Sequence, residues 1–207
     1  MTKNKPDRIS TILFDIGGVY MKGDVTDFIN DSYKALGIDK KISLGNRIAI
    51  NDDLNKGLIT AEECFREFFG VPINDEQMEN IIGLWTSNWK TTDKMTNLVN
   101  LLKKSYTVAA LSNSDEANAK ILYKDGTYSQ FDYVFLSHEM GIIKPDEEIY
   151  IQAVDILGVA PNECLFIDDQ KKCLAPARKM GMKTILFKDY GQLEKDLEEM
   201  GIRGRDK

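Results

Sequence analysis

The chain has 207 residues, of which 43% are hydrophobic, enough for one sizeable α/β core with an inserted segment. Its net charge of −6 at pH 7 and the lack of a basic cluster argue against nucleic-acid and membrane partners. The three cysteines are scattered and odd in number, so neither a disulfide framework nor a zinc site is expected, and a reducing cytoplasm is the expected location.

Five short apolar runs predict the strands. None of them alternates with polar residues, which is typical of strands that are buried on both faces of a parallel sheet. Apolar residues at helical spacing follow some of the later runs, as in 149–157. Strands that alternate with helices favour right-handed crossovers and a doubly wound α/β fold. The predicted strands are Thr11–Phe14, Thr107–Leu111, Tyr133–Leu136, Cys164–Ile167 and Thr184–Phe187.

Residues 23–90, between the first two predicted strands, show four helical patterns and no strand. The second helix is predicted from a weak apolar stripe of Leu44, Ile48 and Leu54. The third begins with a capping box at Thr60–Glu63. A helical insertion directly after the first strand would sit above the edge of the sheet as a cap.

The expected domain boundaries follow from this insertion. Residues 1–22 and 91–207 would form the core, and 23–90 would form the helical cap. The aromatic residues of the insertion are interpreted as the cap's own hydrophobic core, with Trp89, near the hinge, as a candidate to face a ligand.

Two predicted strands end in acidic residues. Thr11–Phe14 stops at Asp15, and Cys164–Ile167 stops at Asp168 and Asp169. Ligands of such sheets bind at the carboxyl ends of the strands, so the three carboxylates are expected at one edge. They would repel one another unless a cation joined them, and an all-oxygen site with few carboxylates suits Mg²⁺.

Groups that suit an anion follow two of the strands. Gly17 and Gly18 let backbone N–H groups approach an anion closely, and Asp15 beside them is suited to attack phosphorus. Ser112 and Asn113 end the second predicted strand where a helix starts, and so offer a hydroxyl and free N–H groups. Each pattern also has an ordinary structural interpretation, as a capped turn or a helix N-cap.

A lysine precedes the helix that follows the third strand. Pro145 is expected in the first turn of that helix, which places Lys144 just before it as a point charge for phosphate. A surface lysine near acids is the alternative. Of Asp168 and Asp169, one side chain is expected to bind metal and the other to orient a ligand or Lys144. The single histidine, His138, is interpreted as a loop residue and not as a base.

Taken in order, four motifs resemble the haloacid dehalogenase-like hydrolase superfamily over nearly the whole chain. They are D-x-G-G at Asp15, S-N at Ser112, G-x-x-K-P-D at Gly141 and F-I-D-D at Phe166. The chain is most similar to the branch with a helical cap between the first two motifs and, within it, to sugar-phosphate phosphatases with a D-x-G start. The resemblance implies a Rossmann-like core and a Mg²⁺-dependent phosphatase of a small phosphorylated metabolite, a sugar phosphate being one candidate.

The resemblance also implies residue roles. Asp15 would be the nucleophile, forming an aspartyl phosphate, and would bind Mg²⁺ together with Asp168 and the backbone carbonyl of Gly17. Asp169 would not bind the metal directly but would orient its ligands. The implied catalytic residues are Asp15, Ser112, Lys144 and Asp169. The transferring phosphoryl group would be bound by Gly17, Gly18, Ser112, Asn113 and Lys144.

Two positions depart from the family pattern. Most of the family's phosphatases carry an acid where this chain has Gly17, and that acid protonates the leaving oxygen and then activates water. General acid–base help of this kind is worth roughly 10²–10⁴-fold in rate. Cys173 stands where the pattern usually has asparagine, and Pro176 is expected to lie still within the first turn of that helix.

Two other functions remain in view, and a third is nearly excluded. A non-hydrolytic relative that binds a ligand or partner is favoured by Gly17 and opposed by the otherwise complete set of site residues. A 2-haloacid dehalogenase also lacks the second acid, needs no metal and attacks carbon, but Lys144 and the D-x-G-G start argue against it. A phosphomutase is opposed because Gly17 cannot move protons between sugar hydroxyls.

Overall fold

The computed structural model describes residues 8–38 and 48–203. Its central sheet is formed by β1 (Thr11–Phe14), β4 (Thr107–Ser112), β5 (Tyr133–Leu136), β6 (Cys164–Asp168) and β7 (Lys183–Leu186). The strand order is β5-β4-β1-β6-β7, and every neighbouring pair is parallel. This confirms the predicted doubly wound α/β fold. β1 lies in the centre, with Phe14 beside Ala110 of β4 and Ile167 of β6.

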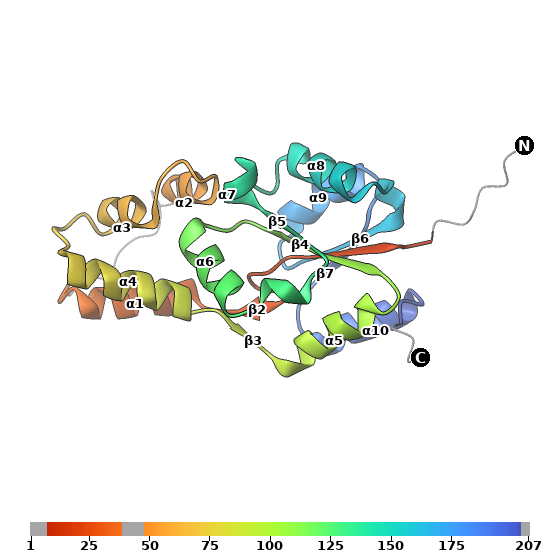
Figure 1. Ribbon diagram of the computed structural model, residues 1–207, viewed down its shortest axis with the longest axis horizontal. Helices are drawn as coiled ribbons and strands as arrows, with labels where there is room; N and C mark the ends of the chain where they lie inside the picture. The colour runs from red at the N-terminus through yellow and green to blue at the C-terminus, as the bar shows by residue number, and fades with distance from the viewer. Residues whose placement is uncertain (1–7, 39–47, 204–207) are drawn as a thin grey trace, which may run out of the picture.

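Helices cover both faces of the sheet (Figure 1). On one face lie α5 (Asp93–Lys103) and α10 (Tyr190–Glu199). On the other lie α8 (Glu147–Leu157) and α9 (Lys171–Lys179). The sheet is therefore buried on both sides, which explains the apolar runs without polar alternation.

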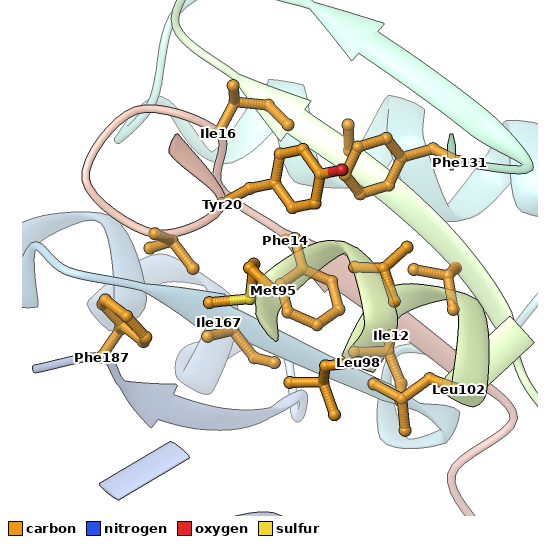
Figure 2. Close-up of a cluster of buried hydrophobic side chains, with 14 of the residues drawn as sticks. Ile12, Phe14, Ile16, Tyr20, Met95, Leu98, Leu102, Phe131, Ile167 and Phe187 are labelled. Carbon is orange, nitrogen blue, oxygen red and sulfur yellow. The ribbon is translucent and has the colours of Figure 1, made fainter. Parts of the chain in front are cut away.

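The two faces have separate hydrophobic cores. Successive side chains of β1 point to opposite faces, so Ile12 and Phe14 enter one cluster and Leu13 enters the other. Figure 2 shows the first cluster, in which the Phe14 side chain of β1 lies between those of Met95 and Leu98 of α5. These cores hold β1 firmly, and with it the residue that follows.

The segment between β1 and α5 begins and ends in a short antiparallel pair of strands that the sequence did not predict. β2 (Met21–Lys22) and β3 (Lys90–Thr91) pair antiparallel. The expectation of no strand within 23–90 is therefore wrong at its last residue, where Lys90 pairs with Lys22. Two-residue strands have no measurable period, so no pattern could reveal them.

Four helices fill the rest of this segment and lie together at one end of the molecule, toward which β1 runs (Figure 1). Their aromatic side chains pack on one another, for example Phe28 with Phe65 and Trp85. Leu44, used to predict the second helix, lies outside the described residues. The helices are α1 (Val25–Ala35), α2 (Ile48–Asn55), α3 (Ala61–Phe69, with the predicted capping box) and α4 (Asp75–Ser87).

Three local expectations are wrong. His138 lies in a one-turn helix, α7 (Ser137–Met140), and not in a loop. Pro145 precedes α8 instead of lying in its first turn, because Asp146 is the N-cap and accepts from the Glu148 N–H. Pro176 lies in the second turn of α9, since this helix already begins at Lys171. The remaining helix of the core, α6, spans Glu116–Lys124. Within the described ranges, no helix is long and apolar enough to cross a bilayer.

Candidate active site

Two predicted acids and the predicted lysine meet at the carboxyl edge of the sheet. The Lys144 ammonium Nζ lies 2.8 Å from Asp15 Oδ1 and 2.7 Å from Asp168 Oδ2. All three residues are at least 96% buried, with relative exposures of 4% for Asp15, 3% for Lys144 and 0% for Asp168. Asp15 thus meets two residues that lie more than a hundred positions further along the chain, in one buried cluster of three ionisable groups.

The backbone fixes both carboxylates of this cluster. Asp15 follows β1 directly, its N–H donates to the Ile167 carbonyl at 2.9 Å, and its Oδ1 accepts from the Ile16 N–H at 2.7 Å. Asp168 is the last residue of β6, and its Oδ1 accepts from the Gln170 N–H at 2.7 Å. The side chains are therefore held before any ligand arrives, as a catalytic site requires.

Lys144 is the fixed cation of the cluster. Burial alone would lower the pKa of Lys144, but attraction to Asp15 and then to Asp168 more than offsets this and raises it. The pKa of Asp15 is raised to about 7. Burial is the largest cause and the Asp168 charge adds to it, while the Lys144 charge lowers the pKa and offsets part of the rise. Two acids face one base in a space shielded from water, so a second cation would lower their mutual repulsion.

A third carboxylate completes a possible cation site. One oxygen from each of Asp15, Asp168 and Asp169 lies within 4.8 Å of the others, and Asp169 is the exposed member. Burial of its carboxylate, with the adjacent Asp168 charge, raises the pKa of Asp169. A set of hard carboxylate oxygens is the kind that Mg²⁺ takes in proteins. The donor set therefore fits the ion that the sequence predicts.

Asn113 does not point toward a ligand but holds Lys144. Its Nδ2 donates to the Lys144 carbonyl at 2.9 Å, and its Oδ1 accepts from the Lys144 N–H at 2.7 Å. Ser112, the last residue of β4, is buried, and its hydroxyl makes a long 3.3 Å contact with the Asn113 carbonyl. Ser112 is thus the freer of the two side chains for an anion, while Asn113 positions the lysine.

The glycines of the first loop have different structural reasons. Gly18 has a φ of +88°, and a Cβ there would lie 2.5 Å from Asp169 Oδ2, so a side chain is excluded on both grounds. Gly17 is not in the left-handed region, and a Cβ there would lie 3.4 Å from the Trp89 ring. The Gly18 N–H donates to the Met21 carbonyl at 2.8 Å, which turns the loop back into β2.

Cys173 lies near the charged cluster, but its thiol is buried. Burial, with a further contribution from Asp168, raises the pKa of Cys173 to about 11. The Cys173 carbonyl accepts from the Tyr150 hydroxyl at 2.7 Å. The Tyr150 ring packs edge-on against Phe166, whose centroid is 5.4 Å from Lys144 Nζ. Position 173 therefore contributes to the packing beneath the lysine through its backbone.

Contacts between the four-helix segment and the core were missed by sequence reasoning. Trp85 Nε1 of α4 donates to Asp115 Oδ2 at 2.9 Å, and Asp115 is the N-cap of α6. The Ser137 hydroxyl donates to the Asn55 carbonyl of α2 at 2.6 Å. Neither pair has a local sequence signal, because the partners are 30 and 82 residues apart.

Two proteins of known activity resemble this chain in sequence. A flavin mononucleotide hydrolase from Arabidopsis thaliana is 32% identical over 151 residues, which cover 72% of this chain and 61% of that protein. The D-ribitol-5-phosphate phosphatase of Bacteroides thetaiotaomicron is 26% identical over 187 residues, covering 85% of this chain and 90% of that one. The chain spans less than two thirds of the first of these relatives.

Solved structures agree with the fold. A HAD family enzyme of Bacteroides thetaiotaomicron, in complex with magnesium and inorganic phosphate, superposes with a TM-score of 0.73 at 28% identity. The comparison covers 89% of this chain and 98% of that one. A sequence model of one family matches residues 9–181, most of the chain. The chain belongs to the haloacid dehalogenase-like hydrolases.

Proposed function

We propose that this protein is a Mg²⁺-dependent phosphatase of a small phosphorylated metabolite, with Asp15 as its nucleophile. The contact that carries the proposal is the one between Lys144 Nζ and Asp15 Oδ1, 2.8 Å long and buried at the end of β1. A buried ammonium beside a strand-end carboxylate favours an anionic substrate at that carboxylate. The family match and the neighbour with magnesium and phosphate support the same chemistry.

The reaction would take place in two steps at Asp15. Its recorded contacts within the described residues use Oδ1, so Oδ2 is the oxygen offered to the substrate. Oδ2 forms a bond to phosphorus, the bond from phosphorus to the leaving oxygen breaks, and the leaving oxygen departs with its electron pair and takes a proton from water. A water molecule then attacks the phosphorus of the aspartyl phosphate, which releases inorganic phosphate and restores Asp15.

The other site residues would bind the transferring group. Lys144 holds one phosphoryl oxygen by charge, Ser112 offers its hydroxyl, and the Gly17 N–H would donate to the same anion, whereas the Gly18 N–H already donates to the Met21 carbonyl. Asp15, Asp168 and the Gly17 carbonyl would hold Mg²⁺, and Asp169 would orient that set from outside it. When bound, the ion neutralises charge that develops on the phosphoryl oxygens.

A polyol or sugar phosphate is the substrate class that the relatives favour. One relative is named for D-ribitol 5-phosphate and another for flavin mononucleotide. Both compounds carry their phosphate at the end of a five-carbon polyol chain. We therefore include phosphates of this kind in the search for a substrate.

The domain arrangement belongs to the same proposal. Residues 23–90 would act as a cap that selects the substrate, joined to the core 1–22 and 91–207 through the β2–β3 pair. The separate aromatic core of α1–α4 supports this division. The three cysteines are buried and unpaired, in keeping with the cytoplasmic location that we propose.

The test is phosphate release from a panel of metabolite phosphates with and without Mg²⁺. The panel includes D-ribitol 5-phosphate, flavin mononucleotide, an anomeric sugar phosphate, acetyl phosphate and p-nitrophenyl phosphate. We expect release that needs Mg²⁺ and disappears in Asp15→Asn. Release from no substrate would favour a non-hydrolytic binding protein, and halide release from 2-chloropropionate without metal would favour a dehalogenase.

A further inference from the structure

The six-membered ring of Trp89 fills the space beside the nucleophile loop. A Cβ at Gly17 would lie 3.4 Å and 3.5 Å from ring atoms Cζ3 and Cη2, and a Cβ at Gly23 would lie 2.7 Å from Cε3. The ring thus lies between two glycines of the segment that follows β1. A Cβ at Gly23 would also lie 2.9 Å from the Asn88 carbonyl oxygen, so the ring and this backbone atom together favour glycine there, and a side chain at residue 17 would have the indole as its direct neighbour.

The space and not the backbone conformation explains Gly17. Its φ is outside the left-handed region, so the backbone there is open to any residue. A Cβ at 3.4 Å from the ring is in ordinary van der Waals contact. A side chain at residue 17 would lie against this apolar ring, and a carboxylate there would lose solvation on that side. Gly17 and Trp89 therefore form a matched pair.

Trp89 is held in place from both sides. Its ring packs edge-on against Trp85 with centroids 6.2 Å apart, and Trp85 is anchored on Asp115 by the 2.9 Å hydrogen bond. The next residue along the chain, Lys90, begins β3, which pairs with β2. Trp89 is half-buried, so part of it remains accessible to a ligand. A fixed, partly exposed indole beside the nucleophile is a surface for substrate recognition.

We propose that Trp89 determines which leaving groups this site accepts, by offering an aromatic surface where a carboxylate would otherwise donate a proton. This inference rests on the proposed phosphatase function. The leaving groups it fits are aromatic rings bonded directly to the phosphate oxygen. Such a ring packs against the indole, and it departs as a stable phenolate that takes its proton later from water.

A binding experiment tests the contact without catalysis. The probe is benzylphosphonate with Mg²⁺, a non-hydrolysable analogue of phenyl phosphate, compared with ethylphosphonate. The chain has two tryptophans, so Trp85→Phe leaves Trp89 as the single indole reporter. We expect benzylphosphonate, and not ethylphosphonate, to change its fluorescence. Trp89→Leu, which keeps apolar bulk, should lower the affinity for benzylphosphonate about three- to tenfold and leave the affinity for ethylphosphonate unchanged. Equal affinity of wild type and Trp89→Leu for benzylphosphonate would overturn the proposal.

A double-mutant cycle tests the pairing of residues 17 and 89. With an alkyl phosphate as substrate, Gly17→Asp alone should raise kcat/KM little above wild type. In the Trp89→Ala background, the same Gly17→Asp change should raise kcat/KM by at least about tenfold. Gly17→Ala with Trp89→Ala is the matched control without a carboxylate and should show no gain. Phe69 packs against Tyr33, Phe65 and Phe68 within the helical segment, so Phe69→Leu controls for loosening of that segment and should change kcat/KM for aryl and alkyl substrates by the same factor.

The outcomes separate this inference from the proposed function. If Gly17→Asp alone gains as much as the double variant, the ring is no obstacle and the inference is wrong. If Trp89→Leu lowers kcat/KM equally for aryl and alkyl phosphates, the indole is structural and the inference is wrong. If Asp15→Asn keeps its activity, the proposed phosphatase mechanism fails, while the benzylphosphonate affinities still decide the role of Trp89.

Discussion

The side chain of Asn113 binds the backbone of Lys144 in both directions, accepting from its N–H at 2.7 Å and donating to its carbonyl at 2.9 Å. The pair joins the end of β4 to the segment before α8, 31 residues further along the chain. Lys144 thereby keeps its place while its ammonium bridges Asp15 and Asp168. The asparagine acts on the chemistry through the lysine it positions.

Asn113→Ala should therefore lower activity more than its distance from the substrate suggests. We expect kcat/KM to fall about 10- to 100-fold, because a lysine displaced by a fraction of an ångström binds the phosphoryl group less well. Loss of two hydrogen bonds should destabilise the fold by about 1–3 kcal/mol, measured by urea unfolding. Asn113→Asp keeps the acceptor and loses the donor, so its kcat/KM should lie between those of wild type and Asn113→Ala. Unchanged kinetics in Asn113→Ala would contradict the positioning role.

Asp15→Asn should abolish turnover while the fold survives. Asparagine keeps the shape of the side chain and can still accept from the Ile16 N–H, but it cannot form the acyl phosphate. We expect a loss of more than about 10³-fold in kcat, with a melting temperature within about 3 °C of wild type at about pH 4, where Asp15 is protonated in the folded protein. Asp31→Asn, at an exposed surface ion pair with Lys34, is a control that should change neither quantity. A well-folded Asp15→Asn that retains a substantial rate would exclude Asp15 as nucleophile.

The site's acids were predictable because each follows its own apolar run. Thr11–Phe14 and Cys164–Ile167 are short, unbroken and buried, so their ends, and the acids after them, could be read locally. The meeting of these ends follows from the parallel sheet. That β1 and β6 are direct neighbours, with Phe14 beside Ile167, is a property of the whole sheet and not of either run.

Contacts between distant segments were not predictable. The Trp85–Asp115 hydrogen bond and the β2–β3 pair join residues that share no period or motif. The two prolines were placed wrongly for a related reason. Pro145 and Pro176 were assigned to first turns because proline is frequent there. The first residues of these helices are instead set by the N-cap Asp146 and by the start of α9 directly after β6. The hydrogen bonds between the Asn113 side chain and the Lys144 backbone were missed because that partner lies 31 residues away.

The metal-free protein should lose stability as pH rises, through Asp15. Burial raises the pKa of Asp15 to about 7 in the folded state, above its ordinary value of 3.8. The folded state therefore holds this proton more tightly, and the resulting stabilisation is full below about pH 4 and is lost as pH rises through about 7. In EDTA, the melting temperature of wild type minus that of Asp15→Asn should fall over this range. A difference that stays constant from about pH 4 to about pH 8 would contradict this environment for Asp15.

Activity should depend on Mg²⁺, because Asp15, Asp168 and Asp169 crowd three carboxylates around one lysine. We expect a chelator to remove phosphate release and added Mg²⁺ to restore it. In the absence of substrate, saturating Mg²⁺ should raise the melting temperature by several degrees, since it binds the folded state alone. Asp168→Asn should largely remove that rise. Full activity after exhaustive chelation would exclude the metal and favour a dehalogenase.

Gly17 should make the second half of the reaction slow. Among the described residues near the loop, residue 17 offers no carboxylate to activate water, and the Trp89 ring lies on that side instead. Aspartyl phosphate formed from p-nitrophenyl phosphate should then accumulate. Nitrophenolate departs without being protonated, so the first step is fast, whereas hydrolysis of the aspartyl phosphate needs an activated water. Rapid mixing should show a burst of nitrophenolate approaching one equivalent per Asp15, followed by a slow steady rate. The burst should be absent in Asp15→Asn and smaller in Gly17→Asp with Trp89→Ala, where the new carboxylate speeds the second step. A linear time course in the wild type would mean that another group or a bound water already serves as the base.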